Sequence, residues 1–443
     1  MSTASPLAPS PGDVKIPTRK ILAWGAWDWG SSAFNAVATT FVFTVYLTSK
    51  SFGDTDHSSA LLGWALGVAG VLVAITAPVT GELTDAAGRR KLWLAIFSGL
   101  VALCLVATVF VEARPSFLWF GIVTIAVGTI FYELAAVNYN AMLTQVSTPK
   151  TIGKVSGLGW GLGYVGGIAL LLIVYVLFIS GDGGVLHIST ANGWNIRLSM
   201  LIAAIWFAVF AIPVLVGVRE NRAPRDVAAQ RTSFFGAYAV LFRTIAALWR
   251  ESRNAVWFLL ASAIFRDGLT GVFTFGGVLA AGTFGFSSGE VIIFAIAANI
   301  VAGVSTIATG PLDDRVGPKP VIITSLIGLV IAGTLVFVLH SGGATVFWVF
   351  GLILCLFVGP AQSASRTFLA RLIPEGREGE VFGLYATTGR AATFLAPTAF
   401  ALFVELFGAQ IFGVIGIVLV LLIGLLVMIP VRAGQQQLAA KAR

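Results

Sequence analysis

Long apolar runs separated by short polar segments dominate the chain from residue 21 to residue 432. The runs are about 20 residues long or longer, which is the length that crosses the hydrocarbon core of a bilayer as a helix. Helices are the expected form, because backbone groups in lipid must bond within their own segment. Alternating ten-residue segments, which are typical of a membrane β-barrel, do not recur. The pattern therefore predicts an all-α polytopic membrane protein.

Twelve transmembrane helices are expected, in two groups of six. An N-terminal bundle, residues 21–218, is expected to hold spans at 21–48, 60–82, 92–112, 116–145, 153–180 and 196–218. A C-terminal bundle, residues 254–432, is expected to hold spans at 254–284, 288–311, 320–340, 345–371, 380–406 and 408–432. We expect residues 1–20 to form a disordered cytoplasmic tail and residues 433–443 to form a second one.

One long segment, residues 219–253, separates the two bundles. It contains several arginines and an apolar stretch from Phe234 to Trp249. This combination predicts a cytoplasmic linker with an amphipathic helix that lies along the inner leaflet.

Composition and charge agree with this architecture. Hydrophobic residues make up 57% of the chain and charged residues 11%, against about 25% charged residues in an ordinary soluble domain. Lysine and arginine are concentrated in the loops of one side, whereas the loops of the other side contain Lys50, Arg114 and Arg197. Because positively charged loops stay in the cytoplasm, both termini are expected there. The formal net charge of +8 therefore reflects topology and does not indicate nucleic-acid binding.

Two loops at equivalent places in the two halves share a motif. The loop after the second span and the loop after the eighth span contain, respectively, Gly81, Asp85, Gly88, Arg89 and Gly310, Asp314, Gly317. Matching order, spacing and sidedness indicate a duplicated six-helix unit, with chance reuse of turn residues as the alternative. An aspartate here can meet a helix N-terminus or an arginine of a neighbouring span. We interpret both loops as gates that latch one conformation.

Charged and polar side chains occur within several spans, although a charge at the bilayer centre costs at least about 2.5 kcal/mol. Asp28, Ser32 and Asn35 share one face of the first span, because they follow each other at helical spacing. The candidates for substrate binding or proton coupling are Asp28, Ser32, Asn35, Glu133, Asn140, Arg266, Asp267, Gln362 and Arg390. The alternative is a structural role, in which these side chains bond neighbouring helices or form internal salt bridges.

The mixture of charges on these spans suits a zwitterionic substrate. Arg266 or Arg390 can hold a carboxylate through two parallel hydrogen bonds. Asp28 or Glu133 can then meet an amine. The same carboxylates are candidate proton carriers, because protonation relieves the cost of removing a carboxylate from water.

The loop after the second span resembles the signature loop of the major facilitator superfamily, and the copy after the eighth span fits the duplication in that family. More narrowly, three separated segments resemble the Atg22-like (UMF1) transporters. They are residues 26–35 in the first span, 155–164 in the fifth and 359–366 in the tenth. Trp27, Gly30 and Ser31 depart from the opening motif of that family, and we expect these differences to touch the cavity.

The resemblance implies the major facilitator fold, in which two pseudo-symmetric six-helix bundles enclose a cavity lined by spans 1, 4, 7 and 10. It implies release of amino acids from a storage compartment in eukaryotes. We therefore expect a secondary active transporter of a small polar or zwitterionic, amino-acid-like metabolite, working by alternating access. Efflux follows from the resemblance alone, and proton coupling is left open. Export of amphipathic drugs or lipids is the alternative, and a non-transporting receptor is a third hypothesis.

Signatures of an enzyme are absent from the sequence. It contains no Walker motif, and its three histidines are scattered, so no ATP hydrolysis, metal or cofactor is expected. The expected partners are a small-molecule substrate, the lipid bilayer and, if coupling exists, protons. The chain is expected to act as a monomer. Compact loops favour a prokaryotic plasma membrane, with a vacuolar membrane as the alternative.

Overall fold

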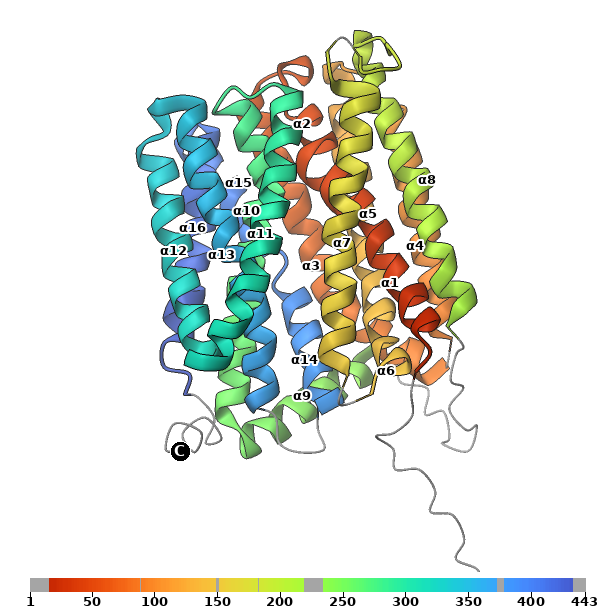
Figure 1. Cartoon of the computed structure of the whole chain (residues 1–443), viewed down its shortest axis with the longest axis vertical. Helices are drawn as coiled ribbons and strands as arrows, with labels where there is room; N and C mark the ends of the chain where they lie inside the picture. Colours follow the sequence, from red (N-terminus) through yellow and green to blue (C-terminus); the bar gives the residue numbers. More distant parts are fainter. Residues whose placement is uncertain are drawn as a thin grey trace, which may run out of the picture.

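The computed structural model describes residues 16–432, apart from residues 88, 149–150, 182, 219–233 and 373–377. Within helices, the described part leaves out the side chains of residues 81–87, 144, 152–154, 234, 237, 314 and 378–380. The described chain is nearly all helical, and most helices run side by side along the long axis of the molecule (Figure 1).

The N-terminal bundle begins with a span built from three consecutive helices, α1 (Thr18–Ser32), η1 (Ala33–Phe41) and α2 (Phe43–Leu47). The other five spans are α3 (Thr55–Ala87), α4 (Arg90–Thr108), α5 (Leu118–Ala141) with the short α6 (Leu143–Val146), α7 (Ile152–Val174) with η4 (Tyr175–Ile179), and α8 (Trp194–Gly217). Short 3₁₀ turns in the loops are η2 (Lys50–Phe52), η3 (Pro115–Phe117) and η5 (Ala191–Gly193).

The C-terminal bundle follows the linker helix α9 (Phe234–Glu251). Its spans are α10 (Arg253–Gly282), α11 (Ser288–Val316), α12 (Pro318–Val338), α13 (Gly343–Leu372), the pair α14 (Glu378–Ala391) and α15 (Leu395–Phe407), and α16 (Gly413–Met428). The turns η6 (His340–Gly342) and η7 (Gln410–Phe412) precede α13 and α16. The last span starts later than expected, because Gly408 ends α15 in the left-handed conformation, with φ of 70°.

Within the described residues, eleven helical stretches are long and apolar enough to cross a bilayer. The remaining expected span is the first one, which is helical from Thr18 to Leu47 but divided into three pieces. The prediction of a twelve-span, two-bundle membrane protein is therefore confirmed.

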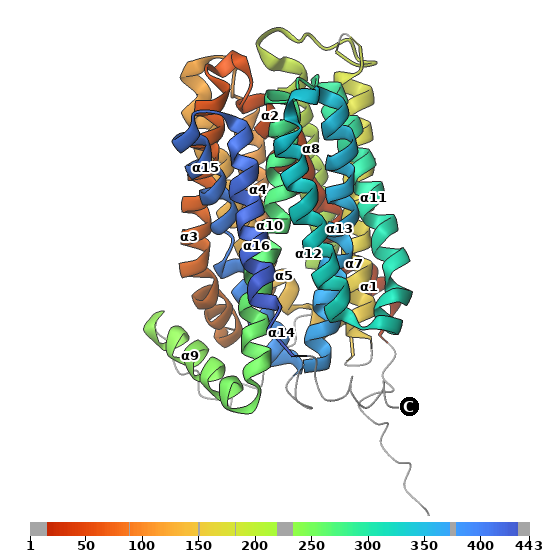
Figure 2. The same cartoon turned by 90° about the vertical axis from the view of Figure 1, so that its left-hand side faces the viewer.

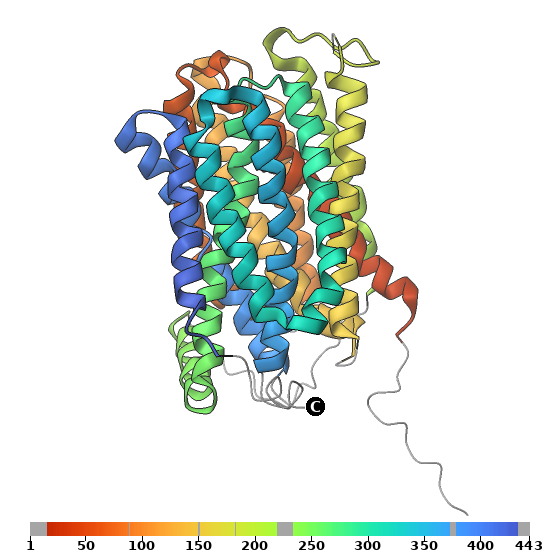
Figure 3. The ribbon, with the colours of Figure 1, turned by 60° about the vertical axis from the view of Figure 1, so that its left-hand side comes forward.

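The two bundles meet along several pairs of elements. On one side α3 packs against α15, and on the other α7 packs against α11, while η1 contacts α10 between them. Figures 1 and 3 show α7, in yellow, running beside α11, in green to teal. The charged residues discussed below lie on the first, fourth, seventh, tenth and eleventh spans.

Two spans are interrupted. In the first span, η1 is a π-helix, and Val42 N–H donates a 3.2 Å hydrogen bond to Val37 O, five residues earlier. In the eleventh span, residues 392–394 form a turn that separates α14 from α15. Interruptions of this kind often accompany functional sites, because they redirect side chains and free backbone groups.

Candidate functional site

Asp28 lies on α1 and faces the neighbouring spans α5 and α7. Tyr139 Oη, on α5, donates a 2.7 Å hydrogen bond to Asp28 Oδ2. A Cβ atom at Gly159 of α7 would contact the same oxygen, so the glycine leaves room for the carboxylate. Among the described residues, Tyr139 is the one side chain that hydrogen-bonds Asp28. The second carboxylate oxygen is thus free to bind another group.

Glu133 and Arg390 join the two bundles. Glu133 lies on α5 and Arg390 in the last turn of α14, and Arg390 Nε is 3.1 Å from Glu133 Oε2. Their side chains are 22% and 12% exposed, respectively. An ion pair this far from water gains strength from the low dielectric, although both charges lose hydration to form it. The pair must break or rearrange if the bundles separate here.

Arg266, on α10, reaches toward α14. Its guanidinium lies 4.1 Å from the centre of the Tyr385 ring, and Nη1 donates a 3.1 Å hydrogen bond to Tyr385 O. Tyr385 Oη is in turn 2.5 Å from Ser365 Oγ on α13. Within the described residues, no carboxylate lies within ion-pair distance of Arg266, which is half-buried.

Arg366, on α13, crosses to the N-terminal bundle. Its Nη1 donates a 2.9 Å hydrogen bond to Ser156 Oγ on α7, and the guanidinium lies 4.7 Å from the Trp160 ring centre. Arg366 is close enough to Asp28 for the two charges to interact, but no described carboxylate forms an ion pair with it. Sequence reasoning left Arg366 out of the candidate site. Its spacing of four residues from Gln362, on one helix face, was the available signal.

Asp267 occupies a different environment from Asp28. It is 4% exposed, and its Oδ2 accepts a 2.5 Å hydrogen bond from the backbone N–H of Ala396. Ala396 lies at the start of α15, immediately after the break in the eleventh span. Asp267 therefore satisfies an amide that the interrupted helix leaves without an intrahelical partner.

The other candidates are uncharged, and several bond their own helix. Ser32 Oγ donates to Trp29 O at 2.7 Å, and Asn140 Nδ2 donates to Ala136 O at 2.7 Å. Asn35, in η1, instead reaches across to α5, where its Nδ2 donates to Tyr132 Oη at 2.7 Å.

Gln362 is half-buried on α13, where its backbone carbonyl accepts a 2.9 Å hydrogen bond from Ser365 Oγ.

Stacked aromatic rings hold the first span against α5. The rings alternate between the two helices with centroid separations of 4.3 to 5.7 Å, in the order Trp24, Tyr139, Trp27, Tyr132 and Phe34. Trp27 is 2% exposed and donates a 3.1 Å hydrogen bond to Ser98 Oγ on α4. It therefore lies in the core of the bundle, and the expectation that it touches the cavity is wrong.

The other departures from the family motif also lie in packed positions. A Cβ atom at Gly30 would lie 2.8 Å from Phe210 Cβ on α8, so the glycine permits close contact between α1 and α8. Ser31 is 4% exposed and donates to Asp28 O. These substitutions tune the packing of the first span and do not line the cavity, contrary to expectation.

The gate loops are described in part. In the backbone, Gly81 and Asp85 fall at the end of α3, Gly310 and Asp314 fall at the end of α11, and Arg89 is an exposed residue before α4. Gly88 and the side chains of Asp85 and Asp314 lie outside the described part. Gly317 ends α11 with φ of 90° and ψ of 159°, a conformation that favours glycine. The latch stays a prediction.

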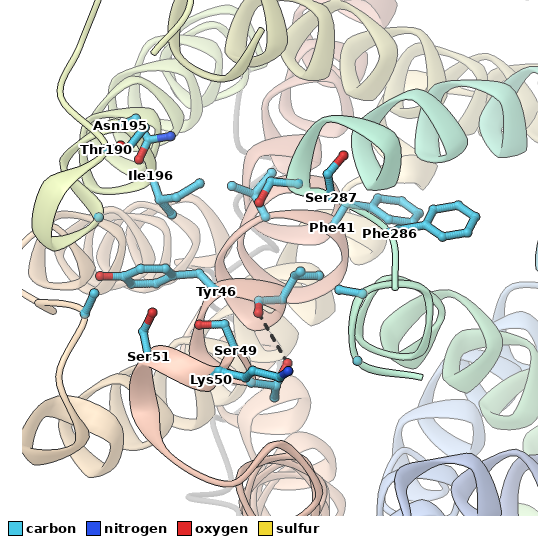
Figure 4. A pocket seen from close by; sticks show the side chains of 18 of the residues that line it. Phe41, Tyr46, Ser49, Lys50, Ser51, Thr190, Asn195, Ile196, Phe286 and Ser287 are labelled. Carbon is cyan, nitrogen blue, oxygen red and sulfur yellow. Dashed lines mark hydrogen bonds between the residues drawn. The ribbon is translucent and has the colours of Figure 1, made fainter. Parts of the chain in front are cut away.

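A separate cavity opens between the bundles at the end of the molecule opposite α9. Its volume is about 490 Å³, and Figure 4 shows polar side chains around it, including Tyr46, Lys50, Asn195 and Ser287. It is lined by the end of the first span, the start of α8, and the loop between α10 and α11. None of the charged residues described above lines this cavity, so it is distinct from them.

Six charged residues from both bundles lie close enough to interact, and we call them the polar network. They are Asp28, Glu133, Arg266, Asp267, Arg366 and Arg390. Sequence reasoning identified all of these except Arg366. The arrangement offers guanidinium groups for an anion and a partly unpaired carboxylate for a cation, on spans that face each other across the bundle interface.

Comparison with known proteins gives the family. A family model described as "Vacuole effluxer Atg22 like" matches residues 45–441. "Uncharacterized MFS-type transporter YxiO" of Bacillus subtilis is 24% identical over 415 residues, covering 93% of this chain and 94% of that protein. "Autophagy-related protein 22" of Yarrowia lipolytica is 23% identical over 335 residues, covering 69% of this chain and 55% of that protein. The chain thus matches about half the length of the fungal relatives.

Solved structures show the same fold. A D-xylose–proton symporter aligns with a TM-score of 0.64 at 15% identity, covering 93% of this chain and 97% of that chain. The nucleoside transporter NupG aligns with a TM-score of 0.61 at 15% identity, covering 93% and 96%. The prediction that the protein is a transporter and not an enzyme is confirmed. The chain belongs to the Atg22-like family and is a membrane transporter of the major facilitator type.

Proposed function

We propose that this transporter exports a small zwitterionic, amino-acid-like metabolite by alternating access, with a proton taking part in the cycle. The observation that carries the proposal is the burial of Arg266 and Arg366 and their lack of a carboxylate partner among the described residues. Both are half-buried between the bundles, and within the described residues neither forms an ion pair with a carboxylate. A guanidinium removed from water requires compensation by an anion or by strong acceptors. A substrate carboxylate is the natural counterion for such a group.

The amine of the substrate has a partner on the opposite bundle. Asp28 has one oxygen bonded to Tyr139 and interacts electrostatically with Arg366. A zwitterion between Arg366 and Asp28 would replace this internal attraction with two contacts, one to each bundle. Such a ligand favours approach of the two bundles, which is the step that alternating access needs.

A proton is proposed for Asp28 because the carboxylate is enclosed by aromatic rings and has one hydrogen-bonding partner among the described residues. Neutralising a carboxylate is the usual response to such an environment. Efflux is proposed from the description of the family as vacuole effluxers. A prokaryotic plasma membrane with cytoplasmic termini, and a monomeric state, are proposed from the short loops and the distribution of arginine.

Counterflow in proteoliposomes tests the substrate class. Vesicles loaded with mixed amino acids should take up selected labelled amino acids, and Arg266→Gln and Arg366→Gln should each lose this uptake. Loss of a charged hydrogen-bond partner costs ~1.5–3 kcal/mol, or about 10- to 150-fold in apparent affinity. The control is Arg114→Gln, which removes an exposed arginine whose Nε lies 3.2 Å from Glu112 Oε2. Its uptake should match the parent.

The proton is tested in the same vesicles with and without an inward-acid gradient. The gradient should change uptake in the parent and have no effect in Asp28→Asn. Intact protein that shows no counterflow with any amino acid would contradict the zwitterion proposal. It would favour amphipathic drugs or lipids as substrates, and a panel of dyes and fluorescent lipids would then be measured.

A further inference from the structure

The linker helix α9 exposes an apolar face. Five residues at helical spacing form a stripe within about a quarter of the helix circumference. We call them the outer stripe: Phe235, Ala239, Phe242, Ala246 and Trp249. Phe235 and Phe242 are 81% and 65% exposed, which is far more than an apolar side chain of this size retains in a packed position.

A second face of α9 packs against the transporter. Tyr238 Oη donates a 2.7 Å hydrogen bond to Ile75 O on α3, and Leu248 is fully buried. An amphipathic helix on a soluble surface buries one apolar face and exposes polar residues on the rest. α9 buries one apolar face and exposes another, so the exposed outer stripe favours an apolar environment around it.

The position of α9 indicates what surrounds the outer stripe. Figure 2 shows α9 at the end of the bundle, extending outward from the bases of α3 and α10. The outer faces of these spans are also apolar and exposed, with Leu72 at 44% and Leu260 at 46%. These faces meet lipid in a membrane protein, and the α9 residue Tyr238 is bonded to one of them at Ile75. The outer stripe therefore continues the surface that contacts the bilayer.

Two arginines follow the stripe along one edge. Arg243 comes directly after Phe242 and Arg250 directly after Trp249, so both lie on the same side of the stripe, and both are exposed. The guanidinium of Arg253 lies 5.8 Å from the Trp249 ring centre. Apolar residues bordered by arginines and a tryptophan match the depth profile of a leaflet, with acyl chains below and phosphates at the edge.

We propose that α9 is a binding site for anionic phospholipid, with the outer stripe inserted among acyl chains and Arg243 and Arg250 holding headgroup phosphates. The site anchors the connection between the bundles to the inner leaflet. It is independent of the transported substrate, so it can stand if the proposed function fails.

An environment-sensitive fluorophore tests the geometry in the full-length protein. Cys104 and Cys355 would be replaced by serine, and Phe242→Cys would be labelled with NBD. Thr151→Cys, at an exposed position directly before α7, is the water-accessible control. In nanodiscs, the label at 242 should emit at shorter wavelength and be shielded from iodide, whereas the label at 151 should be quenched. Equal quenching at both positions would overturn the insertion of the stripe.

The charge is tested by titrating the labelled protein in neutral detergent micelles with phosphatidylglycerol or phosphatidylcholine. Phosphatidylglycerol should bind more tightly. Arg243→Gln with Arg250→Gln should weaken it about 30-fold, as expected for two basic residues at an anionic surface. Arg432→Gln, an exposed arginine at the cytoplasmic end of the last span, is the control and should have no effect. Equal binding of both lipids, or no change in the double variant, would overturn the phosphate site.

Discussion

Asp28 and Asp267 lie on the first spans of the N-terminal and C-terminal bundles, yet their carboxylates bind different groups. Asp28 accepts a hydrogen bond from a tyrosine side chain, whereas Asp267 accepts one from a backbone amide of α15. The difference arises because the eleventh span is broken beside Asp267, while α7 runs unbroken beside Asp28. Sequence alone places both aspartates on cavity-lining spans. It does not reveal the break, which depends on contacts between helices.

Substitution of Asp267 distinguishes a capping role from a requirement for its negative charge in transport. If it serves as a cap, Asp267→Ala should destabilise the protein by ~1–3 kcal/mol, because a buried amide loses its acceptor. Asp267→Asn keeps an oxygen at this place and should retain most of the stability and transport. Thermal unfolding in detergent, together with counterflow, measures both quantities. An Asn variant of unchanged stability that cannot transport would show that the charge itself is required.

The first span shows which features of a single helix can be predicted from the hydropathy pattern and which cannot. Its existence and approximate ends follow from the apolar run, and so does the choice of Asp28 and Asn35 as inward-facing residues. The π-helix η1 could not be predicted from the apolar run, because one extra residue per turn leaves the hydropathy of the run unchanged. The extra residue shifts every later side chain around the axis. The error of a residue count on an ideal α-helix therefore grows along η1, and it is smaller at Asn35 than at Phe41.

The π-helix also contacts the seventh span closely. A Cβ atom at Gly277 of α10 would contact Thr40 O and lie 3.0 Å from Val45 Cγ2, whereas a Cβ at Gly276 meets nothing within 4 Å. Gly277→Ala should force the two bundles apart here, at a cost of ~1–3 kcal/mol for overpacking. We expect slower counterflow, with normal transport by the control Gly276→Ala. Equal rates for the two variants would contradict a requirement for this close contact.

At the scale of the whole molecule, the bundles are joined near both ends. Opposite α9, Gln410 is 3% exposed and accepts a 2.8 Å hydrogen bond from Thr283 Oγ1, directly after α10. Its Nε2 donates to Ser59 Oγ at 2.7 Å, and its backbone N–H donates to Asp56 Oδ1 at 2.7 Å, both on α3. The two-bundle architecture was predictable from the repeat. This contact was not, because Gln410 lies in a loop whose partners are far away in sequence.

Opening of the transporter at this end must break the Gln410 contacts. Gln410→Ala should therefore shift the population toward the state that is open there, by ~1–2 kcal/mol for the lost hydrogen bonds. Labelling of a cysteine at Ser49, which lines the adjacent cavity, would report the shift as faster reaction with a membrane-impermeant thiol reagent. Trp64→Phe is the control, because the exposed Trp64–Glu405 hydrogen bond also joins the bundles but is open to water. A labelling rate unchanged by Gln410→Ala would show that this contact does not hold the end closed.

The polar network has an electrical consequence. When all three carboxylates are ionised, before the proposed proton binds, they match the three arginines and the formal charges sum to zero. Moving one elementary charge through the membrane field changes the free energy by ~2.3 kcal/mol per 100 mV. If the empty carrier is neutral and the bound substrate is a neutral zwitterion, neither step moves net charge through the membrane field. Voltage would then drive the cycle only through a proton that travels with the substrate, and the membrane potential would separate coupled export from simple exchange.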